Sequence, residues 1–300
     1  MNLQSVINSR LGVGLALGLG RVIPPGAGYP LANLVAGWIV SRQNSALVRS
    51  IRANQWVVSQ GKLSAVELDQ VTRQALQHTA HCQYDLYHNL HNKAIIQRLI
   101  KFGAETEEII ERSQQDQKRL LIVGVHMSNF DFVLQAAALR GWQALVLAAP
   151  QPGGGYQMQN EIRRIAGLEI MPASLTAMRR AMKRLEAGGV VITGIDRPLP
   201  DDKHHPVFFG RPSALPVHHI HLAIKARVPV VVVTAITRRD RIYEVIVSQP
   251  IEMQPHTNRH MEVIQNAEAI LKVAEEYICR APYQWAMAYP VWPEVLGIVP

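Results

Sequence analysis

Cysteine is nearly absent from this chain. Cys82 and Cys279 are the only two among 300 residues, and they lie far apart in the sequence. Two separated thiols do not form a disulfide framework, so we expect a reducing compartment. Neither thiol lies in a motif typical of a catalytic nucleophile. The Gly-x-Ser-x-Gly motif of a serine hydrolase is also missing, which argues against that class of enzyme.

Long hydrophobic runs are missing too. The most apolar stretches near the N-terminus are 11–20 and 31–40, and Arg21 and Pro24-Pro25-Gly26 separate them. Neither stretch reaches the ~20 residues that a helix needs to cross a bilayer. We expect residues 1–45 to form two short helices that lie in a membrane interface. The alternative is that these helices pack on the rest of the chain as ordinary core.

Acidic residues are fewer than basic ones. The 31 Lys and Arg residues exceed the 23 Asp and Glu residues, and the net charge is +8. Such a balance favours an anionic partner, which could be a membrane surface, a phosphorylated substrate or a nucleic acid. Many globular proteins are basic without such a partner. The hydrophobic content of 48%, with 18% charged residues, argues against a disordered chain.

The apolar pattern changes near residue 119. Residues 46–118 are predicted to be helical, with 81–102 as one helical stretch, and Ser64 with Glu67 matches a capping box. Beyond 119, apolar runs alternate with helical patterns, which predicts an α/β fold with a mostly parallel sheet flanked by helices. The run 242–248 follows its neighbour after a short turn and is expected to pair antiparallel. We expect strands at 119–125, 143–149, 168–172, 189–195, 229–236 and 242–248, and helices at 129–140, 156–166, 174–187, 214–226 and 258–280.

These patterns also give a domain organisation. We expect membrane-associated helices at 1–45, a helical region at 46–118 and an α/β core at 119–300. Residues 46–300 are expected to form one compact domain, because 300 residues are ample for a single large core.

His126 and Asp131 are the first candidate catalytic residues. His126 follows the apolar run 120–125, and Asp131 lies in the first turn of the helix expected after it, with Ser128 or Asn129 as the N-cap. A carboxylate that binds one imidazole nitrogen leaves the other free as a general base. We therefore predict a His126–Asp131 dyad. A surface histidine beside an ordinary acid at a helix start is the alternative.

The order of motifs resembles a known family. His-x4-Asp after a strand, Gly194-Ile195-Asp196-Arg197, the block 207–212 and the strand 228–233 follow one another as in the bacterial lipid A acyltransferases and the phosphatidylinositol mannoside acyltransferases. The basic segment 47–54 is also similar, and the resemblance covers nearly the whole chain. Many lipid A enzymes have glutamate where this chain has Asp131, which favours another glycolipid acceptor.

The resemblance implies an acyl transfer reaction. A fatty acyl group would pass from acyl-CoA or an acyl carrier protein to a hydroxyl of a membrane glycolipid, with His126 as base and no cofactor or metal. It implies a substrate-binding arginine at Arg164, although Arg163 could fill that role, and a cleft near the acceptor shaped by the block that contains Phe209 and Gly210. We expect the protein on the cytoplasmic face of the membrane, attached to its anionic surface. The predicted substrate residues are Asn129, Arg164, Asp196, Arg197, Phe209 and Gly210.

Several rival functions remain open. Within the same class of enzyme, the acceptor could be a lysophospholipid or glycerol phosphate. A non-catalytic protein that binds lipid or nucleic acid is the rival from another class, but an intact His-x4-Asp motif speaks against it, and we expect no nucleic-acid partner. His81, Asp85 and His88 share a helix face without matching a known zinc pattern. Gly153-Gly154-Gly155, in the expected loop 150–155, lacks the features of a P-loop.

Overall fold

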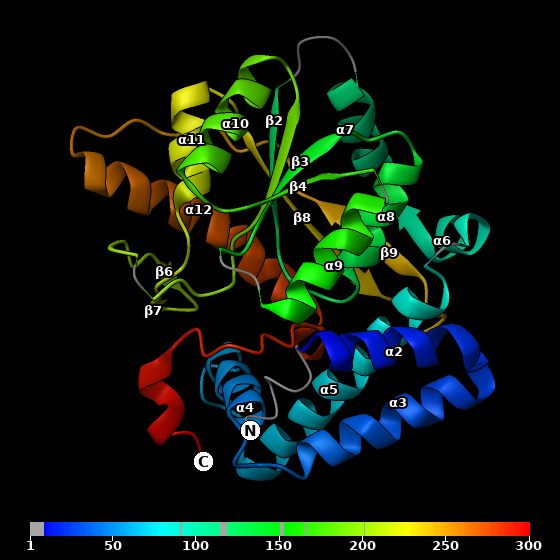
Figure 1. The fold of residues 1–300 in the computed structure, drawn as a ribbon. Helices are drawn as coiled ribbons and strands as arrows, with labels where there is room; N and C mark the ends of the chain where they lie inside the picture. The colour runs from blue at the N-terminus through cyan, green and yellow to red at the C-terminus, as the bar shows by residue number, and fades with distance from the viewer. Residues whose placement is uncertain (1–8, 91, 115–118, 151–152, 166, 201) are drawn as a thin grey trace.

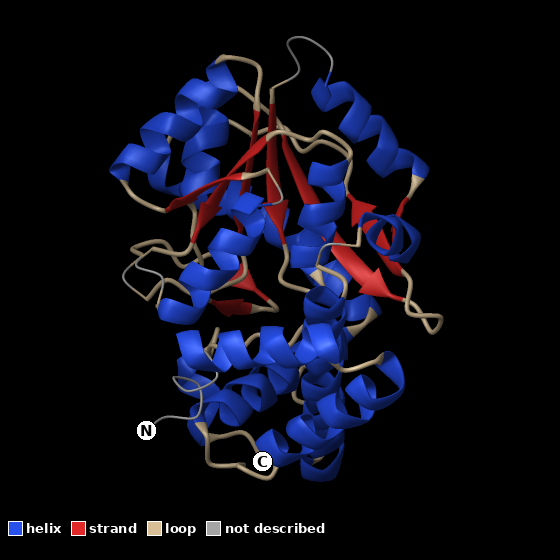
Figure 2. Cartoon of the chain, turned by 45° about the vertical axis from the view of Figure 1, so that its right-hand side comes forward, coloured by secondary structure: helices blue, strands red, loops and turns tan. Residues whose placement is uncertain are grey.

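The computed structural model describes residues 9–90, 92–114, 119–150, 153–165, 167–200 and 202–300. One half of the molecule is built around a β-sheet and the other half is entirely helical (Figures 1 and 2). Residues 1–8 of the expected N-terminal segment and residues 151–152 of the expected loop lie outside the described residues.

The central sheet has seven strands in the order β1-β9-β8-β2-β5-β3-β4. β2, β3, β4, β5 and β8 are mutually parallel, and β8 pairs antiparallel with β9, as predicted. The parallel strands are near-continuous apolar runs, because both faces of the sheet are covered. The strands are β1 (Ile100–Phe102), β2 (Leu120–Gly124), β3 (Ala144–Ala148), β4 (Glu169–Pro172), β5 (Val190–Gly194), β8 (Val230–Thr237) and β9 (Tyr243–Val247).

Helices cover both faces of this sheet (Figure 1). Successive residues of a strand point to opposite faces, so Val191 packs with α10, α11 and α12, whereas Ile192 packs with α7 and α8. α9 contacts α2, α8 and β4. These helices are α7 (Ala104–Gln114), α8 (Phe130–Leu139), α9 (Gly154–Ile165), α10 (Leu175–Glu186), α11 (His218–Ala226) and α12 (Arg259–Arg280).

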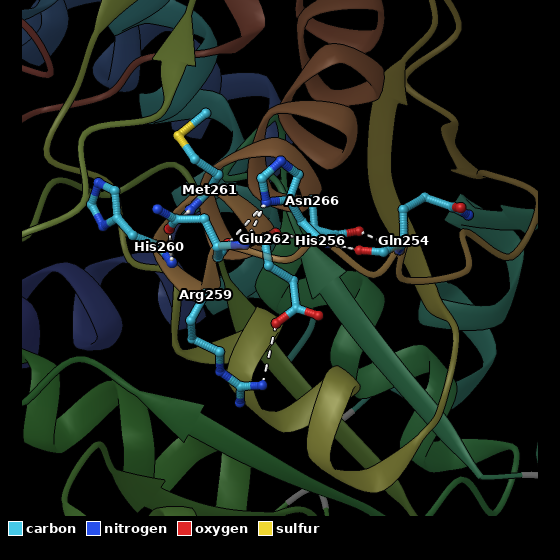
Figure 3. Close-up of polar contacts among 8 residues, drawn as sticks. Gln254, His256, Arg259, His260, Met261, Glu262 and Asn266 are labelled. Atoms are coloured by element: carbon cyan, nitrogen blue, oxygen red, sulfur yellow. Dashed lines mark hydrogen bonds and ion pairs between the residues drawn. The ribbon is translucent and has the colours of Figure 1, made fainter.

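The start of α12 is fixed by polar contacts (Figure 3). Asn258 caps the helix by accepting from the backbone N–H groups of His260 and Met261. Asn266 then holds the preceding loop, because it accepts from the N–H of Gln254 and donates to its carbonyl. The segment that follows the other end of α12, at Arg280, reaches the candidate site through Trp285.

The helical half consists mainly of helices packed around α5 (Figure 1). α5 begins with the predicted capping box between Ser64 and Glu67. Asn54 and Gln55 of α4 donate to the carbonyls of Met287 and Trp285, so the helical half is tied to the C-terminal segment. The helices are α2 (Arg10–Val22), α3 (Pro25–Val40), α4 (Ala46–Val58) and α5 (Ala65–His88).

α2 and α3 carry apolar side chains that face outward. Leu11 is 79% exposed and Val22 is 82% exposed, and only Val13 and Gly20 of α2 are buried. We call the exposed large apolar residues of these two helices the apolar face. Its members are Leu11, Leu15, Leu19, Val22, Leu31, Leu34, Val35 and Trp38. None of the described helices has the length and apolarity to cross a bilayer.

Two parts of the secondary structure differ from the prediction. The expected helical stretch 81–102 is the end of α5, the short helix α6 (Lys93–Leu99) and β1, whose residues pair with β9. The expected loop before α11 contains a small hairpin, β6 (Val207–Phe208) and β7 (Arg211–Pro212). In both cases the strand is too short to show a period of its own in the sequence.

Candidate active site

His126 lies in the turn between β2 and α8, at the carboxyl end of the parallel strands. The N–H of Val125 still bonds to β8 through the carbonyl of Val233, and the N–H of Ser128 bonds to the carbonyl of Gln284. Ser128 has a positive φ of 50°, which turns the chain sharply into the helix. Ligand crevices form at this edge of open α/β sheets.

The carboxylate that binds His126 is Asp196, and not the predicted Asp131. Nδ1 of His126 lies 2.5 Å from Oδ1 of Asp196, and the backbone N–H of His126 donates to Oδ2 at 2.9 Å. Because an ionised carboxylate only accepts, the imidazole carries its proton on Nδ1. The side chain of His126 is 32% exposed, and Nε2 has no hydrogen-bond partner among the described residues. Nε2 is thus available to accept a proton.

Asp196 is fully buried and held by three donors. The third donor is Nε1 of Trp285, 2.7 Å from Oδ2. Burial by itself would raise the pKa of the Asp196 carboxyl, but the nearby His126 charge and these hydrogen bonds outweigh burial and lower that pKa. The carboxylate is therefore ionised at neutral pH and stabilises a protonated His126.

Gly194 makes room for the imidazole. A Cβ atom at this position would lie 2.5 Å from Cε1 of His126, closer than real contacts allow. The ring of Phe130 packs edge-on against the imidazole, with centroids 4.8 Å apart. The ring is therefore confined between a strand end and the start of α8.

Asp131 forms a buried ion pair with Arg163 of α9. Nε of Arg163 donates to Oδ1 of Asp131 at 2.6 Å, and Nη1 donates to Oδ1 of Asn160 at 2.9 Å. The Arg163 guanidinium also lies over the ring of Phe130. The expected contact between Asp131 and His126 is wrong for this structure, because α8 turns Asp131 toward α9.

Arg164 points away from this site. It pairs with Glu161 and donates to the carbonyl of Ile170, and its side chain is 41% exposed. The neighbouring Arg163, which the sequence left open for the same role, is the one buried beside the candidate site. Adjacent residues on a helix lie about 100° apart, and the sequence does not show which one faces inward.

Arg197 lies between two tyrosine rings. Its guanidinium is 4.7 Å from the ring centroid of Tyr156 and 4.3 Å from that of Tyr289, and it donates to the Tyr289 hydroxyl at 3.0 Å. Burial raises the pKa of the Tyr156 phenol, although the Arg197 charge opposes that shift. The guanidinium is therefore held between two aromatic rings, in the residue that follows the buried Asp196.

The kind of enzyme to which this site belongs follows from a comparison with known protein families. The model of the bacterial lipid A biosynthesis acyltransferases matches residues 10–293. The chain belongs to this family. Its general activity is acyl transfer to a lipid.

Two further comparisons are less informative about this chain. Among solved structures, the acyltransferase is similar to the 1-acyl-sn-glycerophosphate (LPA) acyltransferase PlsC from Thermotoga maritima, at 16% identity and a TM-score of 0.37. The likeness covers 84% of this chain and 98% of that chain. No curated protein matches the chain.

Asn129 of the acyltransferase is held by protein groups. Its Oδ1 accepts from the N–H of Phe132 as the N-cap of α8, and its Nδ2 donates to the carbonyl of Cys82. Asn129 is buried, and both ends of its amide are occupied. These contacts hold Asn129 between α5 and the His126 turn, and its role in substrate binding stays a prediction.

Phe209 and Gly210 form the tip of the β6–β7 hairpin. Both have positive φ angles, 50° and 74°, and the N–H of Phe209 donates to Glu275 of α12 at 2.5 Å. The preceding Phe208 is buried against Trp285, the residue that donates to Asp196. The hairpin therefore supports the back of the site through Trp285.

The histidine cluster on α5 has other partners. Nε2 of His81 bonds to Asn33, Nδ1 of His88 donates to the carbonyl of Gly20, and Asp85 accepts from Tyr29 and Tyr243. These contacts join α5 to α2, α3 and β9. Of the supporting residues, the sequence showed no signal for Trp285, Tyr156 or Tyr289, because all three are distant in the chain from His126.

Proposed function

We propose that this acyltransferase moves a fatty acyl group from an acyl thioester to a hydroxyl of a membrane glycolipid. The observation that carries the proposal is the imidazole of His126, with Nδ1 on the buried Asp196 and Nε2 open. Such an imidazole is suited to remove a proton from an alcohol.

The reaction uses one base and no enzyme nucleophile. Nε2 of His126 takes the hydroxyl proton while the oxygen attacks the thioester carbonyl and forms a tetrahedral oxyanion. Collapse of this intermediate breaks the C–S bond, and the thiolate leaves with the proton from the imidazolium as a free thiol. Asp196 stabilises the transient charge on His126. We propose no cofactor beyond the acyl-CoA or acyl carrier protein that donates the acyl group.

Arg163 is the proposed electrophilic group. Asp131 and Asn160 use two of its five N–H bonds, and Nη2 has no partner among the described residues. A guanidinium held at this edge can donate to the oxyanion or to a substrate phosphate. In this scheme Asp131 positions Arg163 and does not touch the imidazole.

We propose that the enzyme attaches to the membrane through the apolar face. Single exposed apolar residues are common, but eight on two neighbouring helices mark an interaction surface. With a net charge of +8, an anionic surface such as the cytoplasmic face of the cell membrane suits this attachment. The protein would then bind peripherally.

Acceptor profiling tests the proposal. Incubation with acyl-CoA or acyl carrier protein and a panel of lipids, followed by mass spectrometry, should give an acylated glycolipid. His126→Ala should lower the rate by on the order of 10²–10⁴-fold without loss of folding. Acylation of only lysophosphatidic acid or glycerol phosphate would overturn the glycolipid acceptor. Unchanged acyl transfer by His126→Ala would overturn the mechanism.

A further inference from the structure

A surface pocket lies where α2, α5 and α6 meet, and His126 is not among its lining residues. It has a volume of about 520 Å³ and is lined by Arg21, Tyr87, His88, Leu90, Asn92 and Lys93. None of the lining residues is an acid, and none belongs to the His126–Asp196 pair or the Asp131–Arg163 pair. This is therefore a separate pocket with a positive lining.

Three of the lining residues, Lys93, Asn92 and Arg21, present hydrogen-bond donors. Lys93 is exposed and has no hydrogen-bond or ion-pair partner among the described residues. Oδ1 of Asn92 accepts from the N–H of Ile95, which leaves its NH₂ group to donate. Arg21, in the last turn of α2, adds a guanidinium. Cations together with an amide donor suit a phosphate group, which only accepts at its ionised oxygens.

The pocket borders the apolar face. Leu11, Leu15, Leu19 and Val22 share one side of α2 at helical spacing, and Arg21 lies about 100° around the helix from Val22. A lipid whose tails contact that side would have its headgroup close to Arg21. Basic side chains of interfacial helices lie among the lipid headgroups, so Arg21 would lie at the depth of the lipid phosphates.

The inner wall is Tyr87, which is only 4% exposed. Burial raises the pKa of its phenol to about 12, and its hydroxyl bonds to Gln159 of α9 and lies in the electrostatic range of Asp131 and Arg163. Tyr87 thus stands between a phosphate in the pocket and the Asp131–Arg163 pair. Such a phosphate would not lie at the reacting hydroxyl.

We propose that this pocket binds the phosphate headgroup of a membrane lipid that is not the acyl acceptor, and so fixes how the enzyme sits on the bilayer. The proposal rests on the proposed membrane attachment through the apolar face. It adds a specific contact to that attachment.

Lysine acetylation followed by peptide mass spectrometry tests the site directly. Phosphatidylcholine vesicles that contain phosphatidic acid should slow the acetylation of Lys93 and leave that of Lys62 unchanged. Pure phosphatidylcholine vesicles should protect Lys93 much less. Equal labelling of Lys93 with and without phosphatidic acid would overturn the site, and equal protection by inorganic phosphate alone would overturn the lipid as its source.

Matched variants separate the pocket from general surface charge. Lys93→Gln and Arg21→Gln should each weaken binding to phosphatidic acid vesicles by about fivefold, the effect of one basic side chain near an anionic surface. Lys62→Gln removes the same charge elsewhere and should have a smaller effect. Asn92→Asp, which keeps the cap of α6, should weaken binding more than Asn44→Asp. Equal effects within each pair would overturn the pocket. If only substitutions in the apolar face reduced vesicle binding, the proposed membrane attachment would hold and the phosphate pocket would be wrong.

Discussion

At the residue scale, the imidazole of His126 is organised by groups that are remote in sequence. Asp196 follows it by 70 residues and Trp285 follows Asp196 by 89. The sequence identified His126 from its place after an apolar run and identified Asp196 as a strand-end acid. It did not pair them, because Asp131 offered a nearer carboxylate. The spacing of residues in the sequence does not show in which direction the side chains of the first helical turn point.

The two carboxylates are expected to act differently. Asp196→Asn should lower kcat by on the order of 10²–10⁴-fold, because an amide can present its NH₂ group to Nδ1 and favour the wrong tautomer. Asp131→Asn should weaken the ion pair with Arg163 and should lower the rate less than Asp196→Asn does. Both rates are measured with the same thioester and acceptor, beside thermal melting.

Asp202→Asn is the matched control. Asp202 also bonds an imidazole, that of His204 at 3.0 Å, but outside the site. Wild-type rates for Asp196→Asn, or an equal loss for Asp202→Asn, would contradict the role given to Asp196.

Gly194 gives a steric test of the same ring. Gly194→Ala would place a methyl group 2.5 Å from Cε1 of His126, so the ring must shift and its Nδ1 bond to Asp196 must lengthen. We expect kcat to fall at least tenfold, with a smaller change in stability. Gly103→Ala, where a Cβ meets nothing within 4 Å, is the control. Full activity in Gly194→Ala would mean that the ring position is not restrictive.

At the element scale, long periodic segments were predictable and short ones were not. The buried strands β2, β3, β5 and β8 and the antiparallel β9 follow from apolar runs and turns. β1 has three residues, and β6 and β7 have two each. Strands this short form because of the strands they pair with. The local sequence pattern therefore does not predict them.

The apolar face gives a prediction for α2. Leu15→Ser with Leu19→Ser should reduce sedimentation with vesicles severalfold, because both side chains are more than half exposed and would lose their burial in the bilayer. Thermal stability should change little. Val66→Ser, which changes a 66% exposed residue of α5, should leave vesicle binding as it is. Equal binding by all three proteins would remove α2 from the attachment surface.

At the scale of the whole molecule, Asp85 links the two halves. It accepts from Tyr29 of α3 and from Tyr243 of β9, each at 2.5 Å. Asp85 itself is buried in α5. Helices α3 and α5 and strand β9 of the sheet therefore meet at one carboxylate.

This link predicts how stability varies with pH. Burial, followed by interactions that include Asp85, raises the pKa values of Tyr29 and Tyr243 above the ordinary value of about 10. Because the folded pKa values exceed the unfolded ones, their stabilisation is complete below about pH 10 and is lost as pH rises further. In urea unfolding experiments, the free energy of unfolding should fall between about pH 8 and about pH 11, and Tyr243→Phe should make this fall smaller. Tyr283→Phe, an exposed control, should keep the full fall; the same curve for all three would contradict the link.

The C-terminal segment has a consequence for how the enzyme is made. Trp285 donates to Asp196, Tyr289 flanks Arg197, and Asn54 of α4 holds both Met287 and Tyr289 by their carbonyls. During translation α2 and α3 leave the ribosome long before this segment does. If the apolar face attaches to the bilayer as proposed, a nascent chain would reach the membrane while its active site is still incomplete. Asp196 and Arg197 would gain their aromatic partners only once residues 285–289 have folded back onto α4.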